Sequence, residues 1–162
     1  MNNTITTLFP IALLVLFASG CAPSNRPPGM PVLHPASITI TQEGKPVSGV
    51  SIRLVPETPS EWPVSSITND SGTAALVTYG QFPGAPEGKY KVVLSKTVLE
   101  EVEPAKDADS AAVTDIYSVI AVEYTKPETT TLEITIEKKR NAETFEIGAP
   151  VRVLVDTIRP GT

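Results

Sequence analysis

The sequence predicts an all-β protein, an antiparallel two-sheet β-sandwich of about seven strands, from three observations. Apolar residues alternate with polar ones in several short runs, as in "SITIT" and "TLEITIE", which is the pattern of a strand with one buried face. Sixteen prolines and ten glycines divide the chain into short segments. The 162 residues are 41% hydrophobic and carry a net charge of −5, as in one ordinary globular domain.

The charge balance argues against nucleic acid as a partner. A nucleic-acid backbone requires clustered Lys and Arg, whereas the 13 basic residues of this chain are scattered among 18 acidic ones. We therefore expect no nucleic-acid binding.

The first 20 residues are predicted to be a signal peptide. Residues 8–18 form an apolar run of eleven, which is too short to span a hydrocarbon core that needs about 20 residues. The length fits the hydrophobic part of a secretory signal, although no Lys or Arg precedes it.

Cys21, the only cysteine, follows the small residues Ala18, Ser19 and Gly20. This stretch resembles the lipobox of bacterial lipoproteins. The resemblance implies that the Cys21 thiol accepts a diacylglycerol and that the freed amine is acylated, with palmitate as a typical chain. The alternative is an ordinary secretory signal that leaves a free thiol, a liability in an oxidising compartment. We expect lipidation and a membrane-anchored protein, in the outer membrane if there are two, because Ala22 is not the aspartate typical of inner-membrane retention.

Residues 21–35 are predicted to be a tether. The stretch from Ala22 to Pro35 contains five prolines and few residues that could pack, as in a semi-extended spacer. The only histidine, His34, lies in this segment, where we expect it to be solvated and without a catalytic or metal-binding role.

The domain is predicted to span residues 36–148 and to begin with two hairpins. The first joins residues 36–43 to 50–54 through the Gly- and Pro-containing segment "EGKPVSG". A proline-rich loop follows, and residues 64–78 form the second hairpin around a turn at 69–72.

The second half of the domain contains three predicted strands and one acidic insertion. Residues 89–95, 131–137 and 144–147 read as strands. Residues 97–115 are rich in Glu and Asp, and we expect a mobile acidic loop with a possible helical turn near 111–117. Residues 149–162 are expected to be a flexible tail or an edge strand.

Three motifs in this order resemble the carboxypeptidase regulatory-like domain, which has a transthyretin-like fold. They are a G-x-P-x-x-G segment at Gly44, Pro46 and Gly49, a T-N-x-x-G turn at Thr68, Asn69 and Gly72, and a P-x-G-x-Y segment at Pro86, Gly88 and Tyr90. The similarity covers roughly residues 38–96. It implies a transthyretin-like, Ig-like sandwich with Tyr90 buried, and it implies little chemistry.

The residue inventory indicates that the protein is not an enzyme. A catalytic zinc needs about three ligands, usually including histidines, and a Ser-His-Asp or Cys-His arrangement needs a histidine in a cleft. We therefore expect no catalytic residues, no cofactor and no metal. One alternative is that the carboxylates of 97–115 bind Ca²⁺, although their spacing lacks the glycine and terminal glutamate of an EF-hand loop.

Three aromatic residues in loops leave one alternative function open. Trp62, Tyr79 and Phe82 could form a platform for a sugar or protein, or could cover one end of the sandwich. We predict a lipid-anchored, non-catalytic interaction or structural module of the bacterial cell envelope, whose partner is an envelope protein or a glycan. The alternative is a carbohydrate-binding accessory module that uses these aromatics.

Overall fold

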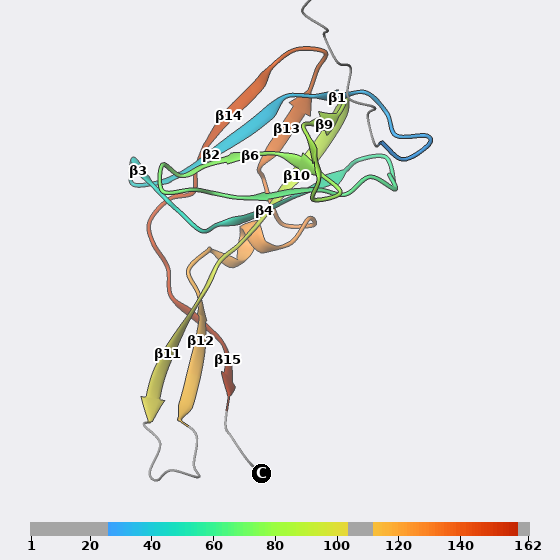
Figure 1. Ribbon diagram of the computed structural model, residues 1–162. Helices are drawn as coiled ribbons and strands as arrows, with labels where there is room; N and C mark the ends of the chain where they lie inside the picture. Colours follow the sequence, from blue (N-terminus) through green and yellow to red (C-terminus); the bar gives the residue numbers. More distant parts are fainter. Residues whose placement is uncertain (1–25, 104–111, 159–162) are drawn as a thin grey trace, which may run out of the picture.

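The computed structural model describes residues 26–103 and 112–158, and it is an all-β protein with a sandwich and a projecting arm (Figure 1). One short 3-10 helix, η1 (Val122–Thr125), lies between strands. The strands are β1 (Leu33–His34), β2 (Ala36–Gln42), β3 (Lys45–Pro46), β4 (Ser51–Pro56), β5 (Val64–Ile67), β6 (Thr73–Ala75), β7 (Val77–Thr78), β8 (Phe82–Pro83), β9 (Ala85–Pro86), β10 (Gly88–Ser95), β11 (Thr97–Glu103), β12 (Val113–Ser118), β13 (Glu133–Ile136), β14 (Asn141–Glu146) and β15 (Val153–Ile158).

Two sheets form the sandwich, as the sequence predicts. The larger sheet has the strand order β13-β10-β4-β5-β7-β8, and the smaller one has the order β14-β2-β3, with β6 also paired to β2. One pair departs from the predicted antiparallel arrangement, because β14 runs parallel to β2, with Asn141 opposite Ala36 and Glu146 opposite Thr41. The short strands β1 and β9 form a separate pair.

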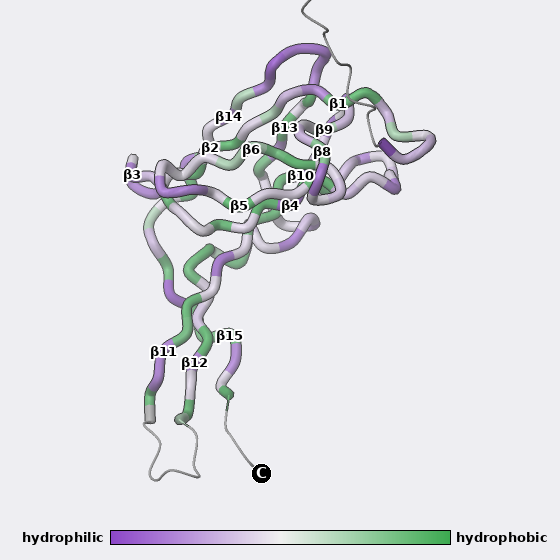
Figure 2. Tube along the Cα trace, in the orientation of Figure 1, coloured by the Kyte–Doolittle hydropathy of each residue, from purple (hydrophilic) through white to green (hydrophobic). Residues whose placement is uncertain are grey.

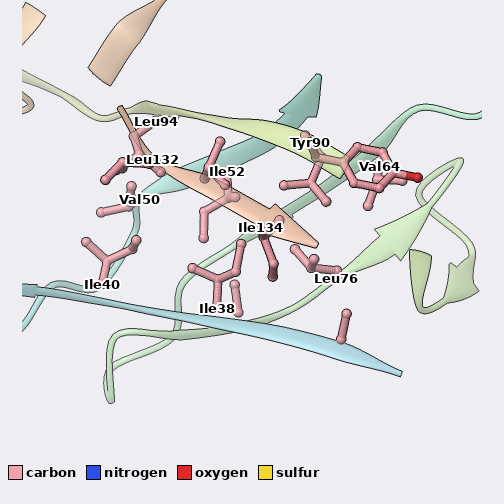
Figure 3. Packing of buried hydrophobic residues seen from close by; sticks show 14 of the residues in the cluster. Ile38, Ile40, Val50, Ile52, Val64, Leu76, Tyr90, Leu94, Leu132 and Ile134 are labelled. Carbon is pink, nitrogen blue, oxygen red and sulfur yellow. The ribbon is translucent and has the colours of Figure 1, made fainter. Parts of the chain in front are cut away.

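The core lies between the two sheets (Figure 3). Ile38 and Ile40 of β2 point inward from the smaller sheet and are fully buried. They meet alternate residues of the larger sheet, as expected for two sheets packed face to face. The buried residues opposite them are Val50, Ile52, Leu54, Val64, Val92, Leu94, Ile134 and Ile136.

The first predicted hairpin is wrong in its pairing. β2 pairs with the two-residue strand β3 and with β6 in the smaller sheet, whereas residues 51–56 form β4 in the larger sheet. Both segments bury alternate residues in the same core. The alternation therefore predicted the strands correctly, but two strands that face each other across a sandwich have the same pattern as two paired strands.

The second predicted hairpin has the expected turn and different partners. The Asn69 carboxamide oxygen accepts hydrogen bonds from the backbone N–H groups of Ser71 at 3.0 Å and Thr73 at 3.1 Å, and Gly72 has a φ of +71°. The flanking strands β5 and β6 nevertheless belong to different sheets, with β5 paired to β4 and β7. The turn thus carries the chain from one layer to the other.

Two of the three motifs of the 38–96 region contact each other in the sandwich. Thr68 Oγ1 donates to the carbonyl oxygen of Val47 at 2.7 Å and accepts from the N–H of Val50 at 2.8 Å, so the T-N-x-x-G turn is joined to the G-x-P-x-x-G segment. Gly72 packs so closely that a Cβ would lie 2.7 Å from Ile40 O and 2.9 Å from Pro46 Cβ. These turn residues are held by hydrogen bonds and by close packing against β2 and β3.

The largest correction concerns the acidic segment 97–115. Its described part is not a loop: residues 97–103 form β11, residues 113–118 form β12, and the expected helical turn near 111–117 is replaced by strand where the structure describes it. β11 and β12 pair antiparallel, and β15 adds to β12. Of the two alternatives left open for residues 149–162, a flexible tail or an edge strand, residues 153–158 form an edge strand, of the arm. These three strands, here called the arm, extend from one end of the sandwich (Figure 1).

The predicted tether is partly incorporated into the fold. Leu33 is buried and His34 is half-buried, because both lie in β1, which pairs with β9. His34 is therefore not the solvated spacer residue that the sequence predicts. The signal peptide of residues 1–20, Cys21 and residues 22–25 lie outside the described residues. Where the structure describes the chain, we find no helix with the length and apolar character needed to cross a membrane.

Candidate functional site

The arm is held at its base by the sandwich. β11 continues the direction of the core strand β10, with only Lys96 between them. Lys96 Nζ donates to Ser48 O at 2.7 Å, and the N–H of Val119 donates to Lys96 O at 3.1 Å. Just beyond β12, Ile120 is fully buried in the core. The arm is therefore anchored to the sandwich through both β11 and β12.

The two faces of the arm follow from its register. In an antiparallel pair, residues directly opposite each other share a face. Glu100, Asp115 and Thr157 are opposite one another across the three strands, and so are Val98, Tyr117 and Leu154. We call this surface the polar arm face.

A hydrogen-bond and ionic network covers the polar arm face. Asp115 accepts from Thr157 Oγ1 at 2.7 Å and from the Tyr117 hydroxyl at 3.0 Å, and Arg152 forms an ion pair with Glu100. The Arg152 guanidinium lies 4.0 Å from the centre of the Tyr117 ring, in cation–π contact. The hydrogen bond from Tyr117 to the Asp115 carboxylate is the main cause of a raised pKa of Tyr117. Most polar groups here have partners within the arm.

On the opposite surface, which we call the apolar arm face, no such network links the side chains of the described residues. Leu99 and Ile116 are opposite each other there, and Val153 is opposite Ser118. The register shift between Ile116 and Tyr117 leaves Val155 as the extra residue of a β-bulge. Val155 shares this face with Val153, since both residues line one hollow at the base of the arm. The apolar residues of the apolar arm face are Leu99, Ile116, Val153, Val155 and Ile158. They share the face with the hydroxyl residues Thr97, Thr114 and Ser118 and with the carboxylates of Glu101 and Asp156, which lie on the two outer strands.

The apolar arm face is exposed to solvent. The side chain of Leu99 is 68% exposed, that of Val155 is 60% exposed, and those of Val153 and Ile158 are each 48% exposed. At its base a hollow of about 300 Å³ continues the apolar surface to Val122 of η1, which is 67% exposed. In Figure 2, hydrophobic residues recur along the arm strands between hydrophilic ones. Contiguous exposed apolar surface of this kind marks interaction sites in soluble domains.

The loop aromatics form a second cluster on the sandwich. The Trp62 and Tyr79 rings are 5.6 Å apart between centroids and inclined by 62°, an edge-to-face contact. Tyr79 is 52% exposed, whereas Trp62 and Phe82 are half-buried. Tyr79 has a φ of +56°, and its N–H donates to Pro63 O at 2.8 Å. The structure thus brings Trp62 and Tyr79 together, and their inclined rings do not form one flat platform.

The carboxylates considered for Ca²⁺ do not converge in the described part of the arm. Glu100 and Glu101 project from opposite faces because they are successive strand residues. Asp115 is held by Thr157 and Tyr117. Among residues 26–103 and 112–158, no three His, Cys, Asp or Glu side chains gather closely enough to hold a metal ion. Asp107 and Asp109 lie outside the described residues, as does the predicted lipidation site Cys21.

Comparisons with known proteins identify no relative of this chain. No protein-family model, curated protein or solved structure matches it.

Sequence reasoning missed the arm because its strands do not alternate cleanly. β11 reads "TVLEEVE", with two adjacent apolar residues and two adjacent glutamates, so neither face is purely apolar. The register also shifts at two bulges. The available signal was the content of Val, Ile, Thr and Tyr in residues 113–120, which favours strands.

Proposed function

We propose that this chain is a lipid-anchored, non-catalytic interaction module of the bacterial cell envelope, and that it binds a protein partner through the arm. The apolar arm face is the observation that carries the proposal. A sheet with one apolar face is stable in water when another layer covers that face. Within the described residues, neither sheet of the sandwich covers it.

The position of the arm supports this role. The first described residues, which follow the proposed anchor at Cys21, lie at the end of the sandwich away from the arm (Figure 1). An anchor at one end and a binding surface at the other would present the arm away from the lipid. Two or three acyl chains suffice for stable attachment, since each buried CH₂ contributes about 0.8 kcal/mol.

We also infer membership of the carboxypeptidase regulatory-like family from the three ordered motifs. The hydrogen bonds of Thr68 to Val47 and Val50, and the close packing of Gly72 on Ile40, give those motif residues a structural reason to occur together. This assignment adds a fold family to the proposal and no chemistry.

Photo-crosslinking in cells tests the interaction function. A photoreactive benzoylphenylalanine replaces Leu99 in the full-length chain, and the matched control carries it at Ile67 of β5, because the two side chains are 68% and 66% exposed. We expect a protein adduct from position 99 and none from position 67. Equal labelling at both positions, or no adduct at either, would show that the arm is not the interaction surface.

A second candidate is glycan binding at the Trp62–Tyr79 cluster, favoured by the exposed Tyr79 ring. Aromatic side chains supply much of the contact surface at such sites. If this candidate is correct, Tyr79→Ala should weaken retention of the protein on envelope polysaccharide at least several-fold, and Ile67→Ala should not. Unchanged retention of the Tyr79 variant would eliminate it.

A further inference from the structure

The shape of the apolar arm face restricts what can cover it. Strands in a sheet are about 4.8 Å apart and rise about 3.3 Å per residue, so the three strands, of six or seven residues each, present a surface about 10 Å wide and 20 Å long. An α-helix with its side chains is about 10–12 Å across, and about 14 residues of helix are 20 Å long. One helix of about four turns therefore matches this face.

The charge of the arm restricts the occupant further. Residues 97–103, 113–118 and 151–158 contain five carboxylates, of Glu100, Glu101, Glu103, Asp115 and Asp156, and one guanidinium, of Arg152, which gives a net charge of −4. On the polar arm face Glu100 is paired with Arg152. On the apolar arm face Glu101 and Asp156 border the exposed Leu99 and Val155. Lys96 at the base donates to Ser48 and is turned toward the sandwich.

These charges disfavour two other occupants. A second copy of this chain would place its own Glu101 and Asp156 in the same interface, and like charges brought together cost binding free energy. An anionic lipid surface would likewise be repelled by a net charge of −4. A basic partner instead gains from charge complementarity and from steering during association.

We propose that the apolar arm face binds an amphipathic α-helix of another protein, with an apolar stripe flanked by Lys or Arg. This inference rests on the proposed interaction function and names the partner class. The apolar stripe would cover Leu99, Val153 and Val155, as apolar helix residues at i, i+3, i+4 and i+7 do when a helix packs into a groove. The flanking basic side chains would lie beside Glu101 and Asp156.

The test uses three synthetic helical peptides of about 15 residues, a length at which helices become marginally stable in water. The first has a leucine stripe flanked by lysines, the second has glutamates in place of the lysines, and the third has the first composition in scrambled order. Each labelled peptide is titrated by fluorescence anisotropy against the full-length chain in phosphatidylcholine nanodiscs, with empty nanodiscs as the reference. We expect the lysine helix to bind at least tenfold more tightly than either of the others.

Variants assign the binding to one face of the arm. Leu99→Ser and Val155→Ser on the apolar arm face should each weaken binding of the lysine helix at least fivefold. Leu154→Ser is the matched control, because Leu154 is 54% exposed but lies on the polar arm face. It should change binding less than twofold. Equal losses in all three variants would overturn the assignment.

Charge reversal tests the second half of the proposal. In the double variant Glu101→Lys and Asp156→Lys, the glutamate helix should bind more tightly than the lysine helix. A lysine preference that survives this reversal, or equal binding of the two helices to the unmodified chain, would overturn the proposed basic partner.

The crosslinking experiment separates failure of this inference from failure of the proposed function. If position 99 crosslinks to a second copy of this chain, to a β-sheet or to an acidic segment, the interaction function stands and the basic-helix partner is wrong. If position 99 crosslinks only to lipid or to nothing, the interaction function itself is wrong. A crosslink to a basic amphipathic helix supports both.

Discussion

The hydroxyl of Tyr90 donates a 2.9 Å hydrogen bond to the carbonyl oxygen of Pro86 while its ring is buried in the sandwich core. Two members of the P-x-G-x-Y motif are thus joined across four residues. A Cβ at Gly88, between them, would contact the Tyr90 ring at 3.5 Å. The motif is a compact unit in which a buried ring has its polar end satisfied, as buried tyrosines require.

Truncation of Tyr90 should destabilise the protein strongly. Tyr90→Ala removes a buried aromatic ring, and we expect a loss of about 3–5 kcal/mol in the free energy of unfolding. Tyr90→Phe keeps the ring and leaves Pro86 O without its donor, so we expect a loss of about 1 kcal/mol. Urea unfolding measures both, with Tyr79→Phe at an exposed ring as the control. If Tyr90→Ala and the unmodified protein have the same urea midpoint, the ring contributes nothing to core packing.

Burial of Tyr90 also predicts a loss of stability at alkaline pH. Burial raises the pKa of Tyr90 above its ordinary value of 10.0. Above pH 10 the unfolded chain therefore releases this proton before the folded chain does, and the unfolded state binds fewer protons. The resulting contribution of Tyr90 to the free energy of unfolding is complete below pH 10 and is lost as pH rises through the raised pKa. The stability advantage of the unmodified protein over Tyr90→Phe should shrink above pH 10. A constant difference from pH 8 to 11 would contradict this.

Glu146 should stabilise the β2–β3 turn in a pH-dependent way. Its carboxylate accepts from the N–H of Glu43 at 2.8 Å and of Gly44 at 3.1 Å, two residues with positive φ. The hydrogen bond from Gly44 is the main cause of a lowered pKa of Glu146, with the side chain of Thr41 second. The stabilisation of the folded state by the Glu146 carboxylate is therefore present above the ordinary pKa of 4.5 and is lost as pH falls through the lowered pKa.

The measurement compares the unmodified protein with Glu146→Gln. The unmodified protein should be the more stable of the two at pH 7, and the difference between their urea midpoints should fall as pH decreases from 5 to 3. Glu143→Gln, at an exposed residue of the same strand, is the control. A difference that is independent of pH would mean that the carboxylate charge does not stabilise the turn.

Gly72 and Gly44 form a matched pair for backbone strain and close packing. Both have positive φ, +71° and +73° respectively. Alanine is strained in this conformation, so either substitution should lower the free energy of unfolding by about 1 kcal/mol. At Gly44 the space for a Cβ is empty, whereas at Gly72 a Cβ would lie 2.7 Å from Ile40 O. We expect Gly72→Ala to lower the free energy of unfolding by about 1–3 kcal/mol more than Gly44→Ala does, because the added Cβ overpacks the site. Equal thermal unfolding temperatures for the two variants would contradict the close approach.

The anchor is tested at Cys21. Because this is the only thiol in the chain, Cys21→Ser should abolish incorporation of labelled palmitate and should move the protein from the membrane fraction to the soluble fraction. Ser24→Ala, three residues away, should leave both unchanged. Retention of Cys21→Ser in the membrane fraction would reject lipid anchoring.

The sequence alone determined which segments form the main strands of the sandwich and which residues they bury. Ile38, Ile40, Tyr90 and Ile134 are buried because alternation places every second residue on the core side, a local property of the extended chain. The turn at Asn69 to Gly72 is likewise local, since the Asn69 side chain holds it through nearby N–H groups. Such features depend on residues close together in the chain, so pattern alone predicts them.

Only the tertiary structure decided which strands pair and where the acidic segment lies. β2 and β4 alternate as the two strands of a hairpin would, yet they belong to opposite sheets. Alternation shows which residues of a strand are buried but not which strand is its partner. β12 and β15 meet across some 40 residues, and Asp115 finds Thr157 only there. The apolar arm face likewise joins Leu99 to Val153 and Val155, which are more than 50 positions away. Contacts of this kind depend on the free energy of packing between segments far apart in the chain, which a local sequence pattern does not reveal.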